Sequence, residues 1–295
     1  MKILICGAGA VGQLYGGMFA AAGHQVSCYG SQGPVAPTEY RLQRIDGSQL
    51  VWHCHQVQQP SVVIVCTKAY QVETAVAELI NQKLLLPTTH LVLLHNGLGP
   101  HESIAKRLND ETSLTLASTR QGALRLSPQE VKHTGLGATD LGLFQGPQRA
   151  SDKILALFQQ SIGDCHWHPN VLQPLWHKLL INSVINPLTA RDQVTNGYLC
   201  GDDYQSEIIE LCAEACDIAN ACGIDAQPQQ LYRQVLLVAE ATASNRSSML
   251  QDVSAGRPTE IDYINGYLIK RAEHHGLPIA AHRALVAQLT DKQQG

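Results

Sequence analysis

The segment 176–186 carries three polar side chains at intervals of four residues, Lys178, Asn182 and Asn186. In a helix, residues four apart share one face, so one stripe would hold an ammonium and two carboxamides. The remaining residues are mostly apolar and cover most of the circumference, which predicts a largely buried helix. The stripe is either solvated or faces a cleft, where burying these groups without partners would cost several kcal/mol. A solvated face normally carries several charges, so the two asparagines favour the cleft.

A lysine in a cleft suits the reduction of a ketone. Hydride attack on the carbonyl carbon develops negative charge on the oxygen, and a positioned ammonium can stabilise that charge and deliver the proton. Lys178 is the candidate for this role, and Asn182 and Asn186 can hold hydroxyl or carboxylate groups of a substrate. Because the residue before a proline resists helical geometry, we expect the helix to stop or kink at Asn186-Pro187.

A second polar cluster lies between residues 245 and 262. Thr259 followed by Asp262 resembles a capping box and predicts the start of a helix. Glu260 would then lie in the first turn, where the helix dipole favours its ionised form. Taken alone, Glu260 is explained slightly better as a residue that serves this helix end than as a catalytic group.

A glycine-rich loop follows an apolar run that starts at residue 3 and precedes a small-residue helix, Ala10–Ala22. In that context G-x-G-x-x-G is a dinucleotide-binding pattern. The first glycine permits the tight turn, the second lets the backbone approach a pyrophosphate, and the third lets helix and strand pack closely. The alternative is a glycine-rich turn without a ligand. We expect the cofactor to bind at Gly7, Ala8, Gly9, Ala10, Val11 and Gly12.

The end of the second strand distinguishes the two nicotinamide cofactors. An acidic residue there would bind the ribose 2′-hydroxyl of NAD, and a basic one would pair with the 2′-phosphate of NADP. This chain has neither in Tyr29–Gly33, where Ser31 or Gln32 could donate to a phosphate. Because no carboxylate is present to repel a phosphate, the segment favours NADPH, with NADH as the second choice.

Two further polar sites follow strands of the first half, where ligands bind in open α/β sheets. Lys68 comes after Val62–Cys66, and Asn96 comes after Leu91–Leu94. Lys68 is either a surface lysine or a partner for a substrate carboxylate or cofactor phosphate. Asn96 could bond the ribose or the carboxamide of the cofactor.

The order of apolar runs predicts an α/β N-terminal Rossmann-type dinucleotide-binding domain plus an all-α C-terminal domain. Strands that alternate with helices are typical of βαβ units and a parallel sheet. Later Thr/Ser/Gly-rich strands look like antiparallel additions to this domain. The predicted strands are Ile3–Cys6, Gln25–Tyr29, Val62–Cys66, Leu91–Leu94, Ser113–Ser118, Ala123–Leu126, Glu130–Thr134 and Thr139–Leu143.

Beyond residue 151 the chain reads mainly as helices, with one short strand near Cys165–His168. We therefore place a dinucleotide-binding domain at 1–168 and a helical substrate and catalytic domain at 169–295. The predicted helices after the first domain are Pro174–Asn186, Ser206–Cys222, Gln229–Glu240 and Glu260–His275.

Composition narrows the class of protein. The chain has 295 residues, 44% of them hydrophobic, which suits two globular domains, and its net charge of −4 argues against a nucleic-acid partner. No window approaches the ~18 apolar residues of a membrane span, and the N-terminal apolar run is too short for a signal peptide. Nine dispersed cysteines indicate reduced thiols and a cytoplasmic protein.

A metal site is not expected. The pairs His53/His55 and His166/His168 have no further ligands at the spacing of zinc sites. Cys212 and Cys216, four residues apart on an apolar helix face, are interpreted as core residues.

These segments together resemble the 2-dehydropantoate 2-reductase (ketopantoate reductase) family. The resemblance spans nearly the whole chain and is most specific in residues 175–190 and in Ser247–Asp252 with Thr259–Gly266. It implies NADPH-dependent reduction of ketopantoate to (R)-pantoate in pantothenate and coenzyme A biosynthesis. It also implies the roles of individual residues: Lys178 as general acid, Glu260 supporting that chemistry, Asn182, Asn186 and Ser248 binding substrate, and Lys68 and Asn96 lining the cofactor and active-site cleft.

The chain departs from better-known members of that family at Ser31, where they have an arginine that grips the 2′-phosphate. Two other functions remain open. One is a related dehydrogenase of another 2-keto or 3-hydroxy acid. The other is a catalytically silent dinucleotide sensor, which would need neither Lys178 nor Glu260. The sequence does not predict an oligomeric state.

Overall fold

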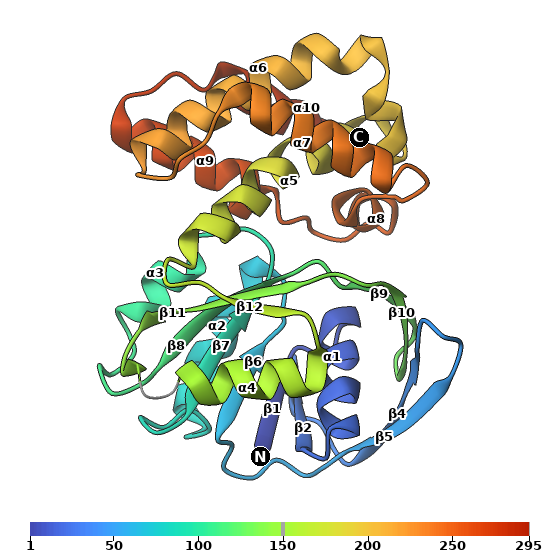
Figure 1. Cartoon of the computed structure of the whole chain (residues 1–295), viewed down its shortest axis with the longest axis vertical. Helices are drawn as coiled ribbons and strands as arrows, with labels where there is room; N and C mark the ends of the chain where they lie inside the picture. The colour runs from blue at the N-terminus through green and yellow to red at the C-terminus, as the bar shows by residue number, and fades with distance from the viewer. Residues whose placement is uncertain (149–150, 295) are drawn as a thin grey trace. The chain divides into compact units, whose positions relative to one another are not determined.

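The computed structural model describes residues 1–148 and 151–294. Its internal contacts divide it into two compact units. The first comprises Met1–His95 and Pro100–Val171, and the second comprises Asn96–Gly99 and Leu172–Gly295. The first unit is α/β and the second is helical (Figure 1), which confirms the predicted fold class.

The first unit is built on an eight-stranded sheet of order β12-β11-β8-β7-β6-β1-β2-β3. Its helices are α1 Ala10–Ala21, α2 Ala69–Asn81, α3 Pro100–Ala105 and α4 Ser151–Ile162. The strands of this sheet are β1 Lys2–Cys6, β2 Gln25–Gly30, β3 Gly33–Pro34, β6 Val62–Val65, β7 His90–Leu94, β8 Leu114–Thr119, β11 Thr139–Gln145 and β12 Cys165–Trp167.

The central strands of this sheet pair in parallel, as the apolar runs predicted. β1 lies between β2 and β6, and every residue of β6 and β7 is buried. The expectation that antiparallel additions begin at β8 is wrong, because β8 pairs parallel with β7 and only β11 runs antiparallel to it. The burial of β8 from Leu114 to Ser118 fits a central position, since parallel strands are covered on both faces.

A second sheet of order β5-β4-β10-β9 contains two strands that the sequence did not predict. They are β4 Thr38–Gln43 and β5 Gln49–Cys54, and their partners are β9 Gly122–Ser127 and β10 Glu130–Gly135. The last two therefore join this sheet instead of completing the first one. In β5 buried residues alternate with exposed ones, and the apolar Val51 is among the exposed, so the apolar residues do not mark one buried face.

Trp52 of β5 anchors the second sheet to α1. Added Cβ atoms on Gly16 and Gly17 would lie 2.8 Å and 3.1 Å from its ring atoms, so the indole needs glycine at both positions. The indole also stacks on Tyr40 with ring centroids 4.7 Å apart.

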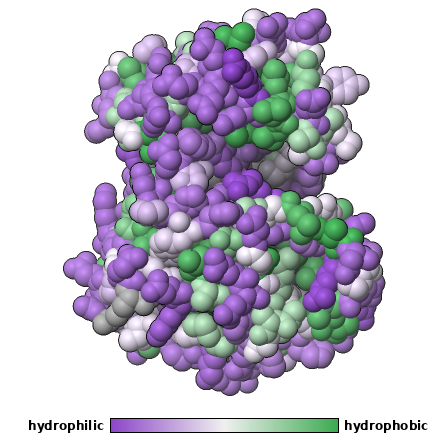
Figure 2. All heavy atoms as spheres, viewed as in Figure 1, coloured by the Kyte–Doolittle hydropathy of each residue, from purple (hydrophilic) through white to green (hydrophobic). Residues whose placement is uncertain are grey.

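Hydrophobic residues are visible where β9 and β10 lie (Figure 2), and Leu124 and Leu126 of β9 are about half exposed.

The second unit packs five helices and a 3-10 turn around the long helix α5. The elements are α5 Leu172–Asp192, η2 Asn196–Cys200, α6 Asp202–Ala221, α7 Pro228–Ala241, α8 Ser248–Ser254, α9 Ile261–His275 and α10 Ala280–Gln294. Cys212 and Cys216 are fully buried in its core, as predicted. Within residues 1–148 and 151–294, no helix combines the length and the apolarity that crossing a membrane requires.

Of the two outcomes expected at Asn186-Pro187, a stop or a kink, the stop is wrong. α5 continues to Asp192 with Pro187 inside it. The local preference before a proline is overruled because every residue from Ser183 to Ala190 is buried in the core of the unit, and breaking the helix there would expose that face.

His90 of β7 makes the stability of the fold depend on pH. Its Nε2 lies 2.8 Å from Thr115 Oγ1, and burial lowers its pKa to about 4, against about 6.5 in an unfolded chain. The neutral imidazole is therefore the folded form. Its contribution is complete above about pH 6.5 and is lost as the pH falls toward about 4.

We predict that the free energy of unfolding falls by up to about 3 kcal/mol between those pH values because of His90. In His90→Gln, which keeps a hydrogen-bonding group beside Thr115 but cannot titrate, this part of the pH dependence should disappear. Urea unfolding at a series of pH values measures it. An unchanged pH slope in His90→Gln would contradict the prediction.

Candidate active-site residues

The glycine loop is shaped by close backbone packing. Gly7 follows β1 with φ +99°, and its amide donates to Tyr29 O at 2.9 Å. A Cβ on Gly7 would lie 2.9 Å from Thr67, and a Cβ on Gly12 would lie 2.0 Å from Gly7 O. Neither position accepts a side chain, so these two glycines are required by the turn and by the contact between α1 and the loop.

Gly9 differs from the other two glycines because a Cβ there would meet nothing within 4 Å. It is the N-cap residue of α1, it has no side chain to cap the helix, and the first turn of α1 contains no acidic residue. The backbone N–H groups of that turn and the positive end of the helix dipole are suited to an anion. The open space above Gly9 therefore fits a cofactor phosphate.

Gln13 fixes this loop and was missed by the sequence analysis. It is 1% exposed, and its Nε2 donates to Ala8 O at 2.9 Å and to Pro128 O at 3.0 Å. The glycine loop is thus tied to the turn between β9 and β10. A polar residue within a helix of small and apolar residues was the available signal, but its partner lies 115 residues away in the chain.

Ser31 and Lys68 lie at the same edge of the sheet as the glycine loop. Ser31 is exposed and directly follows β2, and Lys68 is the half-buried N-cap residue of α2. Because β2 and β6 flank β1 in parallel, their carboxyl ends meet beside the loop. The structure therefore places these predicted cofactor residues together.

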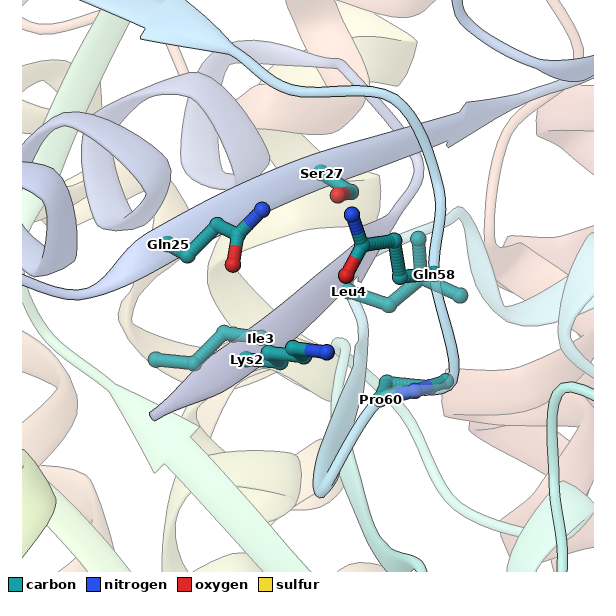
Figure 3. A pocket seen from close by; sticks show the side chains of 7 residues that line it. All are labelled: Lys2, Ile3, Leu4, Gln25, Ser27, Gln58 and Pro60. Atoms are coloured by element: carbon teal, nitrogen blue, oxygen red, sulfur yellow. The ribbon is translucent and has the colours of Figure 1, made fainter.

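A small pocket lies at the opposite edge of the sheet, where β1 and β2 begin (Figure 3). Ligands of open α/β sheets bind at the carboxyl ends of the strands, so this pocket is not the candidate cofactor site. Its lining residues are Lys2, Ile3, Leu4, Gln25, Ser27, Gln58 and Pro60.

In the second unit, a glycine turn brings Asn96 to Glu260. Gly97 has φ +75°, and a Cβ there would lie 2.5 Å from Tyr263 O. The same carbonyl accepts a hydrogen bond from Leu98 N at 2.9 Å. Asn96 Nδ2 donates to Glu260 Oε2 at 3.5 Å, across 164 positions of sequence. Asn96 is thus part of the helical unit, although the strand before it belongs to the first unit.

The predicted capping box before α9 is wrong. Glu260 itself is the N-cap residue, outside the first turn, and its carbonyl accepts from Ile264 N at 3.1 Å. Its side chain makes no cap hydrogen bond. The carboxylate, in a residue only 4% exposed, is instead directed to Asn96. The local sequence indicated that the Glu260 side chain stabilises the helix end, but the side chain is held by Asn96, which is distant in the sequence.

The Lys178 stripe becomes more buried along α5. Lys178 and Asn182 are half-buried, and Asn186 is 6% exposed. The stripe is therefore not a solvated face along its whole length. Ser248 is exposed and begins α8, a helix the sequence did not predict. Its neighbour Ser247 caps that helix by accepting from Leu250 N at 3.1 Å.

The pair His166/His168 has acidic partners. His166 lies 2.8 Å from Asp164, and His168 lies 2.8 Å from Asp140, which also pairs with Arg120 at 2.8 Å. Among the residues that the structure describes, no group of three or more His, Cys, Asp or Glu side chains is arranged to hold a metal ion.

Comparison with known proteins matches both units. Residues 3–146 match the family model described as ketopantoate reductase PanE/ApbA, and residues 170–293 match its C-terminal model. The 2-dehydropantoate 2-reductase of Vibrio cholerae is 34% identical over 100% of this chain and 98% of its own length. That of Pyrococcus abyssi is 31% identical over 92% of this chain and 91% of its own.

Solved structures give the same result. A PanE/ApbA family ketopantoate reductase from Ralstonia eutropha JMP134 is 26% identical, with a TM-score of 0.85 and 100% of both chains covered. D-mandelate dehydrogenase in complex with NADH and anilino(oxo)acetate has a TM-score of 0.89 over 100% of this chain and 99% of its own. At 24% identity, that second likeness concerns the fold. With both units matched and a relative above 30% identity along its whole length, this chain belongs to the ketopantoate reductase family.

Proposed function

We propose that this protein reduces 2-dehydropantoate to (R)-pantoate with NADPH, in the cytoplasm, as a step of pantothenate and coenzyme A biosynthesis. The observation that carries the proposal is the pairing of Asn96 with Glu260 in the unit that bears the Lys178 stripe. This unit thus holds a lysine that can donate a proton and a carboxylate bound to Asn96, in a chain whose relatives carry that enzyme name.

The first unit fits a dinucleotide. The open space over Gly9 and the uncapped start of α1 suit the pyrophosphate, and Lys68 and Ser31 lie at the same sheet edge. A bound nicotinamide cofactor would supply the hydride. NADPH is proposed because no carboxylate follows β2 to repel a 2′-phosphate, and Ser31 can donate a hydrogen bond to it.

In the second unit, Lys178 acts as the general acid. As hydride adds to C2 of the substrate, the ketone oxygen gains negative charge, and the Lys178 ammonium stabilises it and transfers a proton to give the hydroxyl group. Asn182, Asn186 and Ser248 bind the substrate's hydroxyl and carboxylate groups. Glu260 and Asn96, which hold each other in place within the same unit, support this chemistry.

Turnover separates this proposal from its alternatives. Purified protein is mixed with 2-dehydropantoate and NADPH or NADH, and the reduced-nicotinamide absorbance is followed. Loss of absorbance with 2-dehydropantoate supports the proposal. Turnover only with another 2-keto acid would assign a different substrate, and cofactor binding without any turnover would indicate a sensor.

Lys178→Ala should lower kcat by roughly 10²–10⁴-fold, because the variant lacks the proton donor. Cofactor affinity, measured by fluorescence titration, should stay within about twofold, since the glycine loop, Ser31 and Lys68 lie on the first unit. Lys153→Ala, on the exposed face of α4, is the matched control and should keep wild-type kcat. A wild-type kcat in Lys178→Ala would remove Lys178 from the mechanism.

Ser31→Arg should raise the preference for NADPH over NADH, because a guanidinium can pair with the 2′-phosphate in a bidentate manner. The ratio of kcat/KM for the two cofactors measures this preference. Ser61→Arg, an exposed position at the opposite edge of the sheet, should leave the ratio unchanged. If Ser31→Arg also leaves it unchanged, Ser31 does not face the 2′-phosphate.

Gly97→Ala should reduce kcat/KM for 2-dehydropantoate by about 10–100-fold, because the new Cβ would displace the Asn96 turn from Tyr263 O. Gly276→Ala is the matched control, since Gly276 has φ +66° but nothing within 4 Å of its Cβ position. Both variants should lose at least about 1 kcal/mol of stability to left-handed strain. Equal activity in the two variants would contradict a role for the Asn96 turn.

A further inference from the structure

Pro187 leaves a gap in the hydrogen bonding of α5. A proline has no N–H, so the carbonyl four residues earlier loses its helical donor. In α5 that carbonyl belongs to Ser183, and it accepts instead from Asn265 Nδ2 of α9 at 2.8 Å. Both residues are fully buried. A side chain from another helix therefore supplies the hydrogen bond that the backbone of α5 lacks.

The donor is itself held in one orientation by His282 of α10. His282 Nε2 lies 3.1 Å from Leu211 O, and a carbonyl can only accept, so the proton is on Nε2. His282 Nδ1 is then an acceptor and receives the second hydrogen of Asn265 Nδ2 at 2.9 Å. Both amide hydrogens of Asn265 are committed, one to α5 and one to α10.

The segment of α5 around this bond is also tied to α8. Thr189 Oγ1 lies 2.7 Å from Ser247 Oγ, the cap of α8. Asn186 falls between the two attachment points, and Asn182 and Lys178 lie one and two turns before it. The geometry of the stripe thus depends on how α5 is held from Ser183 to Thr189.

We propose that Asn265 is a positioning residue for the reaction: by donating to Ser183 O in place of the Pro187 N–H, it keeps α5 aligned through the proline and so fixes Asn186 and Lys178. The inference rests on the proposed function of that stripe. Without Asn265, a buried carbonyl would lack a donor and α5 would be free to bend, since proline is the commonest site of sharp helix kinks.

A merely structural role predicts a different outcome. In that case Asn265→Ala would lower stability and leave kcat of the folded protein unchanged. Asn196 provides the matched control, because it is another buried asparagine of this unit, and its Nδ2 donates to Thr242 Oγ1 at 2.8 Å. Asn196→Ala should lower the melting temperature without lowering kcat.

The decisive test is a double-mutant cycle with Pro187→Ala, which restores the backbone N–H to Ser183 O. Asn265→Ala should lower kcat about 10–100-fold, with cofactor affinity unchanged. Pro187→Ala alone should keep wild-type kcat, and the double variant should recover to within about threefold of Pro187→Ala. Hydrogen exchange of peptides spanning 183–192 should rise in Asn265→Ala and return in the double variant, reporting α5 independently of activity.

Two results would overturn the proposal: kcat within twofold of wild type in Asn265→Ala, whether or not hydrogen exchange in α5 rises, or a double variant as slow as the single one. If Asn265→Ala alone does not fold, the comparison of the double variant with Pro187→Ala decides. Failure of the proposed function looks different, because wild type would then show no turnover of 2-dehydropantoate, or Lys178→Ala would be fully active.

Discussion

A proline inside a buried helix is the constraint on which the helical unit depends. Removing one N–H from the middle of α5 leaves Ser183 O without a helical donor, and an unsatisfied carbonyl in a dry core costs about 1–3 kcal/mol. The bond from Asn265 removes that cost and at the same time fixes where α9 lies against α5. Because α9 begins directly after Glu260, the same bond also fixes the start of α9, and with it Glu260, relative to the Lys178 stripe on α5.

The hydrogen bonds of this unit give a precision that its apolar core alone would not. Leu, Ile and Ala side chains pack well in several neighbouring arrangements, whereas a hydrogen bond has a narrow range of distance and angle. The Asn265 bond sets α9, the contact of Thr189 with Ser247 sets α8, and the turn at Gly97 sets Asn96. All three lie close to residues proposed to handle the substrate.

In the first unit, the glycines of α1 let two other segments pack closely against this helix: the glycine loop and the second sheet. Gly12 allows the loop carbonyl of Gly7 to touch the helix, which shapes the turn proposed to bind the cofactor phosphates. About one turn further along α1, Gly16 and Gly17 receive the indole of Trp52 from the second sheet. The dinucleotide motif explains only the first of these contacts. The second is why a four-stranded sheet can dock on the same helix.

The sequence by itself determined the features that depend on neighbours along the chain. Apolar runs specified the parallel strands, the glycine spacing specified the loop, and the four-residue interval put Lys178 and Asn186 on one face, because these patterns follow directly from strand and helix geometry. Only the tertiary structure decided what depends on distant partners. The partners of Gln13 and Asn265 could not be read from the sequence, since their bonds reach Pro128 O and Ser183 O across 115 and 82 positions. Strands β4 and β5 of the second sheet were missed because exposed residues alternate with buried ones in β5, and because the pairing of β4 with the predicted strand β10 joins segments far apart in sequence.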